Sequence, residues 1–244
     1  MTPDPHGFEP ARVFIGYDPR EEVAVNVLSA SFQAHASIPI QIAQVRLDQL
    51  KGVYTREPDP KQSTAFSFSR FLVPWLAGYR GWALFIDADM LCLGDIAELW
   101  ALRDERMAVQ VVKHHHDCAP GLKFQGMPQT PYGRKNWSSV MLFNCGRCRA
   151  LTPEFVNSAT GLELHQFRWL PDAEIGELPP AWNVLVGVQE LPPEPKVLHY
   201  TLGGPWFDDC RTMPESERWM QARAAMNQPL PVEKPLSPAV LSRG

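Results

Sequence analysis

The chain has 244 residues and is 45% hydrophobic, so it is long enough to bury a sizeable core in one large domain. Its formal net charge of -4 provides no basic footprint, which argues against a nucleic-acid partner. The sequence contains no run of about 18 apolar residues, so it predicts no membrane span.

The 5 cysteines and the N-terminal segment bear on the redox compartment. An odd number of thiols, with no apolar signal region ahead of them, favours reduced cysteines and a cytoplasmic location. Cys145 and Cys148 have the spacing of a redox pair or of half a zinc site, but no second pair completes four ligands. We therefore favour a turn after a buried strand for this segment.

The first predicted elements are a strand, a helix and a second strand. The strand covers 12–16 and ends at a glycine. Asp18 then suits an N-cap, Pro19 the first helical position, and Glu21 the third residue of a capping box. A helical stripe continues through Phe32, and alternating isoleucines predict a strand over 38–42.

Further strands and helices alternate along the rest of the chain, which predicts an α/β fold with a mainly parallel sheet. The expected strands cover 82–86, 108–112, 137–143, 182–186 and 196–200, and the expected helices cover 66–75 and 96–102, with a helical patch from 153. We expect residues 11–228 to form one domain, with a flexible N-terminus at 1–10 and a Pro-rich tail at 229–244.

The motif Asp87-Ala88-Asp89 follows the strongest buried-strand signal, at 82–86. Carboxylate oxygens suit hard cations such as Mg²⁺ and Mn²⁺, and ligands of α/β sheets gather beyond the carboxyl ends of the strands. Two aspartates at this spacing occur by chance about once in such a chain, so the context must decide their role.

His199 closes a later apolar strand and is followed by Gly203 and Gly204. Imidazole suits Mn²⁺ beside carboxylates, and glycines let a backbone approach phosphate closely. A single histidine at a strand end is, however, more often a structural residue. A separate tract, at 114–117, holds three consecutive histidines. We assign it to a solvated or acceptor-facing loop rather than to a metal site.

Four segments taken together, 15–18, 63–71, 85–89 and 199–206, resemble nucleotide-sugar glycosyltransferases of the GT-A fold. The best match is the retaining family 8 type, which includes glycogenin-like and bacterial galactosyltransferase-like enzymes, and the order of the segments agrees as well. The resemblance implies a Rossmann-like single domain with a mixed, mainly parallel central sheet flanked by helices.

The resemblance also implies roles for individual residues. Mn²⁺, or Mg²⁺, would be held by Asp87, Asp89 and His199. Arg70 would approach the donor diphosphate and sugar, and Asp172 would be the acceptor-side carboxylate. The donor would further be bound along a set of residues at strand ends and in the glycine turn, namely Gly16, Tyr17, Asp18, Ala88, Gly203 and Gly204. Asp18 has a competing role as an N-cap.

The chain departs from the family pattern at the diphosphate. The lysine expected shortly before Pro205-Trp206 is missing, so the backbone amides of Gly203 and Gly204, or the side chain of Lys123 or Arg134, would replace it. The stretch around Asp172 matches the family only loosely. The chain therefore resembles a divergent member.

The expected activity is transfer of a hexose from a nucleotide diphosphate sugar, a UDP-sugar, to a hydroxyl of a saccharide or another acceptor, with retention of configuration. One alternative is a metal-dependent phosphohydrolase that uses the same aspartates with His115 or His116. Another is a sugar-nucleotide binding protein without turnover, because the lysine is absent.

Overall fold

The computed structural model describes residues 9–57, 62–114, 121–122, 128–129 and 134–227. Within these residues, a six-stranded sheet has the strand order β2-β1-β3-β8-β5-β9. Its strands are β1 (Ala11–Gly16), β2 (Ile40–Val45), β3 (Trp82–Ile86), β5 (Val109–Val111), β8 (Val140–Asn144) and β9 (Ile175–Glu177). β1 pairs in parallel with β2 and β3, and β5 with β9, whereas β8 runs antiparallel to both of its neighbours. The predicted mixed, mainly parallel sheet is confirmed.

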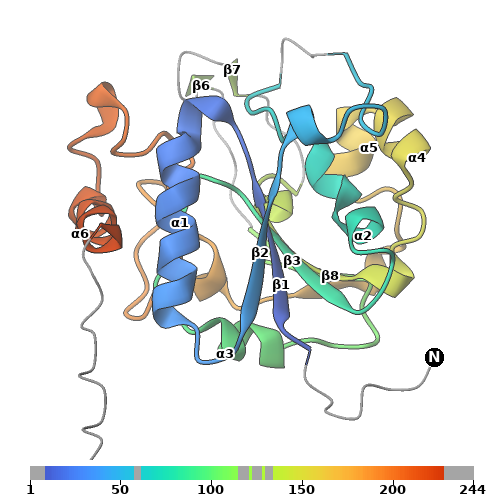
Figure 1. Ribbon diagram of the computed structural model, residues 1–244, viewed down its shortest axis with the longest axis horizontal. Helices are drawn as coiled ribbons and strands as arrows, with labels where there is room; N and C mark the ends of the chain where they lie inside the picture. Colours follow the sequence, from blue (N-terminus) through green and yellow to red (C-terminus); the bar gives the residue numbers. More distant parts are fainter. Residues whose placement is uncertain (1–8, 58–61, 115–120, 123–127, 130–133, 228–244) are drawn as a thin grey trace, which may run out of the picture.

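Helices cover both faces of this sheet (Figure 1). α1 (Glu22–His35) and α6 (Ser216–Met226) lie on one side, and α2 (Val73–Leu76), α4 (Pro153–Ser158) and α5 (Gly161–His165) lie on the other. α3 (Ile96–Ala101) begins at Asp95, whose side chain accepts a hydrogen bond from the amide of Ala97. No helix in the described part of the chain is both long and apolar enough to cross a membrane.

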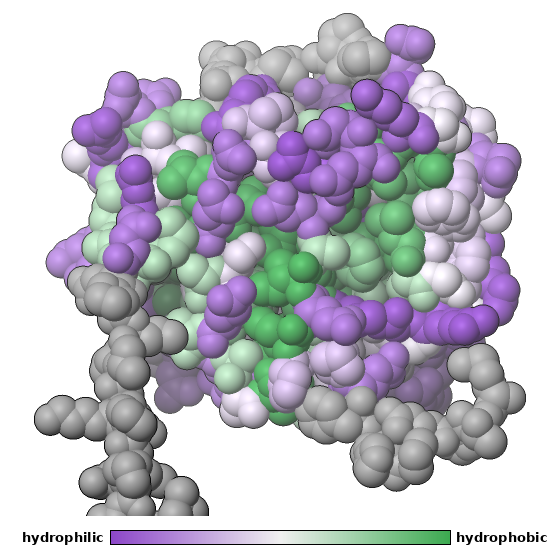
Figure 2. All heavy atoms as spheres, viewed as in Figure 1, coloured by the Kyte–Doolittle hydropathy of each residue, from purple (hydrophilic) through white to green (hydrophobic). Residues whose placement is uncertain are grey.

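Burial explains the order of the strands. Every residue of β3 and of β8 is buried, as expected for central strands covered on both faces, and their runs are continuously apolar up to Asn144. β2 lies at an edge, and its residues alternate between partly buried and exposed until the buried Val45. Figure 2 shows a band of apolar side chains over β2, with polar side chains on either side of it.

A second sheet of three short strands positions the site. It contains β10 (Val184–Leu185), β11 (Val197–His199) and β4 (Met90–Cys92), with β11 in the middle. β11 is antiparallel to β4, and His199 pairs in register with Met90. Residue 199 is therefore brought beside the turn that follows β3. A two-stranded sheet, β6 (Gly121–Leu122) with β7 (Pro128–Gln129), completes the strands of the described residues.

Several local predictions were wrong in detail. Residues 19–21 form a 3₁₀ turn before α1, and the capping box is not formed, because Glu21 at the N-cap of α1 makes no capping hydrogen bond. The helix expected over 66–75 is a 3₁₀ turn (Ser69–Leu72) followed by the short α2. The strand expected from 137 begins only at Val140, after a 3₁₀ turn. α6 was not predicted.

The turn interpretation of Cys145 and Cys148 agrees with the structure. A 3₁₀ turn (Cys145–Arg147) follows β8, and both thiols are buried and free. Burial raises the pKa of Cys145 to about 12, so this thiol stays protonated at neutral pH. The segments 1–8 and 228–244, which include most of the predicted N-terminus and the whole predicted tail, lie outside the described residues.

Candidate functional site

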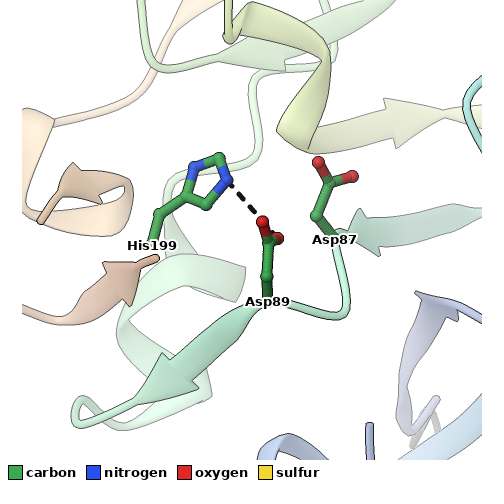
Figure 3. A group of neighbouring side chains, drawn as sticks. All are labelled: Asp87, Asp89 and His199. Carbon is green, nitrogen blue, oxygen red and sulfur yellow. Dashed lines mark ion pairs between the residues drawn. The ribbon is translucent and has the colours of Figure 1, made fainter. Parts of the chain in front are cut away.

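Asp87, Asp89 and His199 converge at the carboxyl end of β3 (Figure 3). Each offers one ligand atom, and these atoms all lie within 4.8 Å of one another. The backbone fixes the group, because the amide of Asp87 donates to the carbonyl of Ser139 and the amide of Tyr200 donates to the carbonyl of Asp89. The predicted metal set is thus brought together from residues more than a hundred positions apart in the sequence.

Arg70 lies against the first aspartate. Its Nη1 is 2.7 Å from Asp87 Oδ1, and both side chains are almost buried, at 7% and 12% exposed. The guanidinium also donates to the carbonyl of Ser138 over 2.9 Å and lies over the rings of Phe66 and Phe85. Arg70, which was expected beside the donor diphosphate, therefore holds Asp87 in this structure.

Burial raises the pKa of Asp87 to about 6, even though Arg70 opposes the shift; the charge of Asp89 adds to it. The second aspartate behaves differently. Burial also works against ionisation of Asp89, but the neighbouring His199, whose Nε2 is 3.4 Å from Asp89 Oδ1, together with a backbone hydrogen bond and the charge of Arg70, lowers the pKa on balance. The pair is thus divided into one carboxylate that protonates easily and one that stays ionised.

The donor set fits a divalent cation. Asp87 Oδ1 and Asp89 Oδ1 are buried, and neither accepts a well-aligned hydrogen bond from the described residues, although Arg70 and His199 lie close as ion-pair partners. Buried oxygens without hydrogen bonds are costly, and a cation that binds both would remove this cost. Two carboxylates with one imidazole also form a suitable set for Mn²⁺.

Asn183 orients the histidine. His199 Nδ1 is 3.0 Å from Asn183 Oδ1, and the amide nitrogen of Asn183 donates to Ser139 Oγ over 2.8 Å. Because Asn183 thus presents its oxygen to the ring, Nδ1 of His199 must carry a proton and donate it. The lone pair of a neutral ring then lies on Nε2, which faces Asp89 and the metal position.

The segment predicted to hold the nucleoside is tightly packed. Asp18 accepts two hydrogen bonds from Arg20 through Oδ1, and its Oδ2 accepts from Arg20 and from the amide of Ala65. Both oxygens are therefore used within the protein, as expected for the competing structural role. Tyr17 is buried with the guanidinium of Arg46 3.9 Å above its ring, and Gly16 leaves no room for a Cβ beside Phe66.

The glycine turn after β11 serves packing as well. Gly203 has φ +112°, which favours glycine, and its amide donates to the carbonyl of Tyr200. A Cβ on Gly204 would overlap the indole ring of Trp206. Donor binding by Gly203 or Gly204 remains a prediction, and the amide of Gly203 would have to exchange its partner.

Asp172 does not belong to the three-ligand group. Its side chain is 76% exposed and lies 2.6 Å from Arg134, whose guanidinium also donates to the carbonyl of Gln166. The acceptor role of Asp172 remains a prediction. Lys123, His115 and His116 lie outside the described residues.

Two residues, Asn183 and Glu21, differ from what the sequence predicts. Asn183 lies at the second position of the strand expected over 182–186, and no local pattern assigned it a role. Glu21, predicted to complete a capping box, is instead buried at 5% exposed, and its Oε2 has no hydrogen-bond partner within the part of the chain that the structure describes.

Comparisons with known proteins agree on the fold. The WbbM bifunctional glycosyltransferase, solved in its apo form, superposes with a TM-score of 0.62 at 18% identity over 90% of this chain; the match spans only half, 50%, of the WbbM chain. The galactosyltransferase LgtC, solved with donor and acceptor sugar analogs, gives a TM-score of 0.59 at 14% identity, covering 89% of this chain and 97% of LgtC. The GT-A type fold is confirmed.

No family model matches the chain. In sequence, it is 45% identical to Protein CDI of Arabidopsis thaliana over 229 residues, which cover 90% of this chain and 88% of that protein. At this identity and coverage, this chain, with its GT-A type fold and its Asp-Asp-His group, belongs to the same family as Protein CDI.

Proposed function

We propose that this protein is a metal-dependent glycosyltransferase that moves a hexose from a nucleotide diphosphate sugar, a UDP-sugar, to a hydroxyl group of a saccharide or another acceptor. The observation that carries the proposal is the convergence of Asp87, Asp89 and His199, with Nε2 of the histidine oriented by Asn183. The GT-A type fold supports it, since the solved structures that share this fold include glycosyltransferases.

The chemistry requires help for the leaving group. When the bond between the anomeric carbon and the phosphate breaks, negative charge develops on the departing diphosphate. A cation bound at this site supplies Lewis-acid stabilisation of that charge. Asp87, Asp89 and His199 would hold the cation, and Asn183 keeps the ring of His199 in place.

Arg70 contributes positive potential at the same point while it holds Asp87. The buried setting strengthens each of these electrostatic effects, because little water competes. We propose retention of configuration with attack on the same face from which the diphosphate leaves, in line with the retaining enzymes that the sequence resembles. The aspartates near this position are then ligands rather than nucleophiles. A cytoplasmic location is also proposed.

The test combines binding with turnover. Purified protein is screened by thermal shift against UDP-sugars and other nucleotide sugars, with and without Mn²⁺, and a ligand that binds the native state raises the melting temperature. We expect a shift for one donor that depends on Mn²⁺. Donor hydrolysis without an acceptor, measured as nucleoside diphosphate released, should fall about 100- to 1000-fold in Asp89→Asn.

Product analysis separates the alternatives. A glycosyltransferase releases the intact nucleoside diphosphate and free or transferred sugar, whereas a phosphohydrolase releases a sugar phosphate or inorganic phosphate. A binding protein would show the thermal shift without products. Undiminished Mn²⁺-dependent hydrolysis by Asp89→Asn, at unchanged melting temperature, would contradict the proposal.

A further inference from the structure

Glu21 is a buried carboxyl group that neither the fold nor the three-ligand group accounts for. It is 5% exposed, and its Oε2 is buried without a hydrogen-bond partner among the described residues. It occupies the N-cap position of α1, where a side chain often bonds the first free amides, yet it makes no capping hydrogen bond. Its burial therefore has no explanation in local helix structure.

The packing of α1 carries Glu21 to the metal end of the fold. Ser31 of α1 accepts a hydrogen bond from the amide of Cys92 in β4, and Val27 shares a core cluster with Leu91. Glu21 precedes Ser31 by about three helical turns, roughly 15 Å, and Asp89 precedes Cys92 by three strand residues, roughly 10 Å. The start of α1, where Glu21 lies, is therefore on the same side of these contacts as Asp89.

The electrostatics agree with this placement. Burial raises the pKa of Glu21 to about 9, and among neighbouring charges Asp89 contributes most, followed by Asp18; Arg20 opposes the shift and Asp87 adds to it. Three aspartates therefore raise the pKa of this carboxyl, and one arginine offsets them in part. Such a concentration of buried acid is unfavourable in the metal-free protein and becomes favourable beside a cation.

We propose that Glu21 is a further member of the cation site that accepts a hydrogen bond from a cation-bound water. Glu21 does not belong to the group whose ligand atoms lie within 4.8 Å of one another, so it acts through water rather than as a direct ligand. The inference rests on the metal centre of the proposed function. Groups that hydrogen-bond to the ligands of a metal typically alter metal affinity by about 10- to 100-fold.

The experiment is a calorimetric titration with Mn²⁺ alone, paired with thermal melting of the metal-free protein. Glu21→Gln keeps the size of the side chain and removes its charge. The matched control is Glu22→Gln, the exposed next residue. We expect Glu21→Gln to bind Mn²⁺ about 10- to 100-fold more weakly, with a melting temperature equal to or above that of the wild type. Glu22→Gln should match the wild type in both measurements.

The directions of the two changes, in Mn²⁺ affinity and in the metal-free melting temperature, distinguish this role from a structural one. A merely structural carboxyl would lower the metal-free melting temperature when replaced and leave Mn²⁺ affinity unchanged. Mn²⁺ affinity of Glu21→Gln within twofold of the wild type, or failure of this variant to fold, would overturn the inference while leaving the proposed function standing. Absence of Mn²⁺ binding by the wild type would overturn the metal centre itself.

Discussion

Two arginine–aspartate pairs of this protein have nearly the same length and very different settings. Arg70 and Asp87 are 2.7 Å apart with side chains 7% and 12% exposed, whereas Arg134 and Asp172 are 2.6 Å apart at 24% and 76%. The first pair is held among aromatic rings and a backbone carbonyl at the end of β3. The second lies at the surface, before β9.

The difference separates a rigid region from an adaptable one. Around Asp87 each side chain has its orientation fixed by other buried groups, which is what a site for a small cation and a diphosphate requires. Around Asp172 the carboxylate is solvated, and its ion pair with Arg134 can open at little cost. An acceptor site that admits larger and more varied molecules is expected in a setting of the second kind.

The largest expected effect comes from breaking the buried pair. Arg70→Met keeps the apolar stem but leaves Asp87 buried without its cation, which should lower the free energy of unfolding by about 3–5 kcal/mol. The matched substitution Arg134→Met should cost less than about 1 kcal/mol. Urea denaturation at pH 7 measures both. Equal losses would show that the two settings do not differ as described.

The next largest effect is the contribution of Asp87 to the pH dependence of the unfolding free energy of the metal-free protein. Its folded pKa of about 6 lies above the value of 3.8 for the unfolded chain, so the folded state binds the proton more tightly. The stability that it contributes is complete below about pH 4 and is lost as pH rises through 6, about 3 kcal/mol in total. The difference in unfolding free energy between the wild type and Asp87→Asn, measured from pH 4 to 7, isolates this term. A difference that does not change with pH would refute it.

Replacing Asn183, the partner of His199, is expected to have a smaller effect than the changes at Arg70 and Asp87. Asn183→Ala removes the partner of His199 Nδ1 and frees the ring, so Mn²⁺ affinity should fall about 10- to 100-fold. Asn157 is a suitable control, because it bonds backbone groups at Val53 and Thr55. Asn157→Ala should lose stability but keep Mn²⁺ affinity in a calorimetric titration. Equal affinity in the two variants would exclude an orienting role for Asn183.

The sequence could predict what local pattern determines. β3 is a continuous apolar run followed by acidic residues, so both the strand and the aspartates were evident, and Asp18 was correctly identified as a cap. Contacts formed across the fold could not be predicted in the same way. The approach of His199 depends on β4 and β11, which have only three residues each, too few to show a periodic pattern.

Glu21 shows why a local rule fails when tertiary structure competes. Its spacing from Asp18 satisfies the capping box, but residues 19–21 form a 3₁₀ turn, so the α-helix begins after Glu21. Similarly, the link from Asp18 to Ala65 joins residues 47 positions apart and gives Oδ2 of Asp18 a second partner besides Arg20. Neither outcome could be inferred from the spacing alone.

The smallest expected effect concerns Asp172. Asp172→Asn removes only an exposed charge, so the free energy of unfolding should change by less than about 1 kcal/mol. Mn²⁺ affinity and donor hydrolysis without an acceptor should stay within about twofold of the wild type, because the residue lies outside the three-ligand group. If Asp172 serves the acceptor, transfer to that acceptor falls while hydrolysis persists, and the ratio of the two products measures this directly. A parallel loss of hydrolysis and transfer would place Asp172 on the donor side and remove the distinction between the two regions.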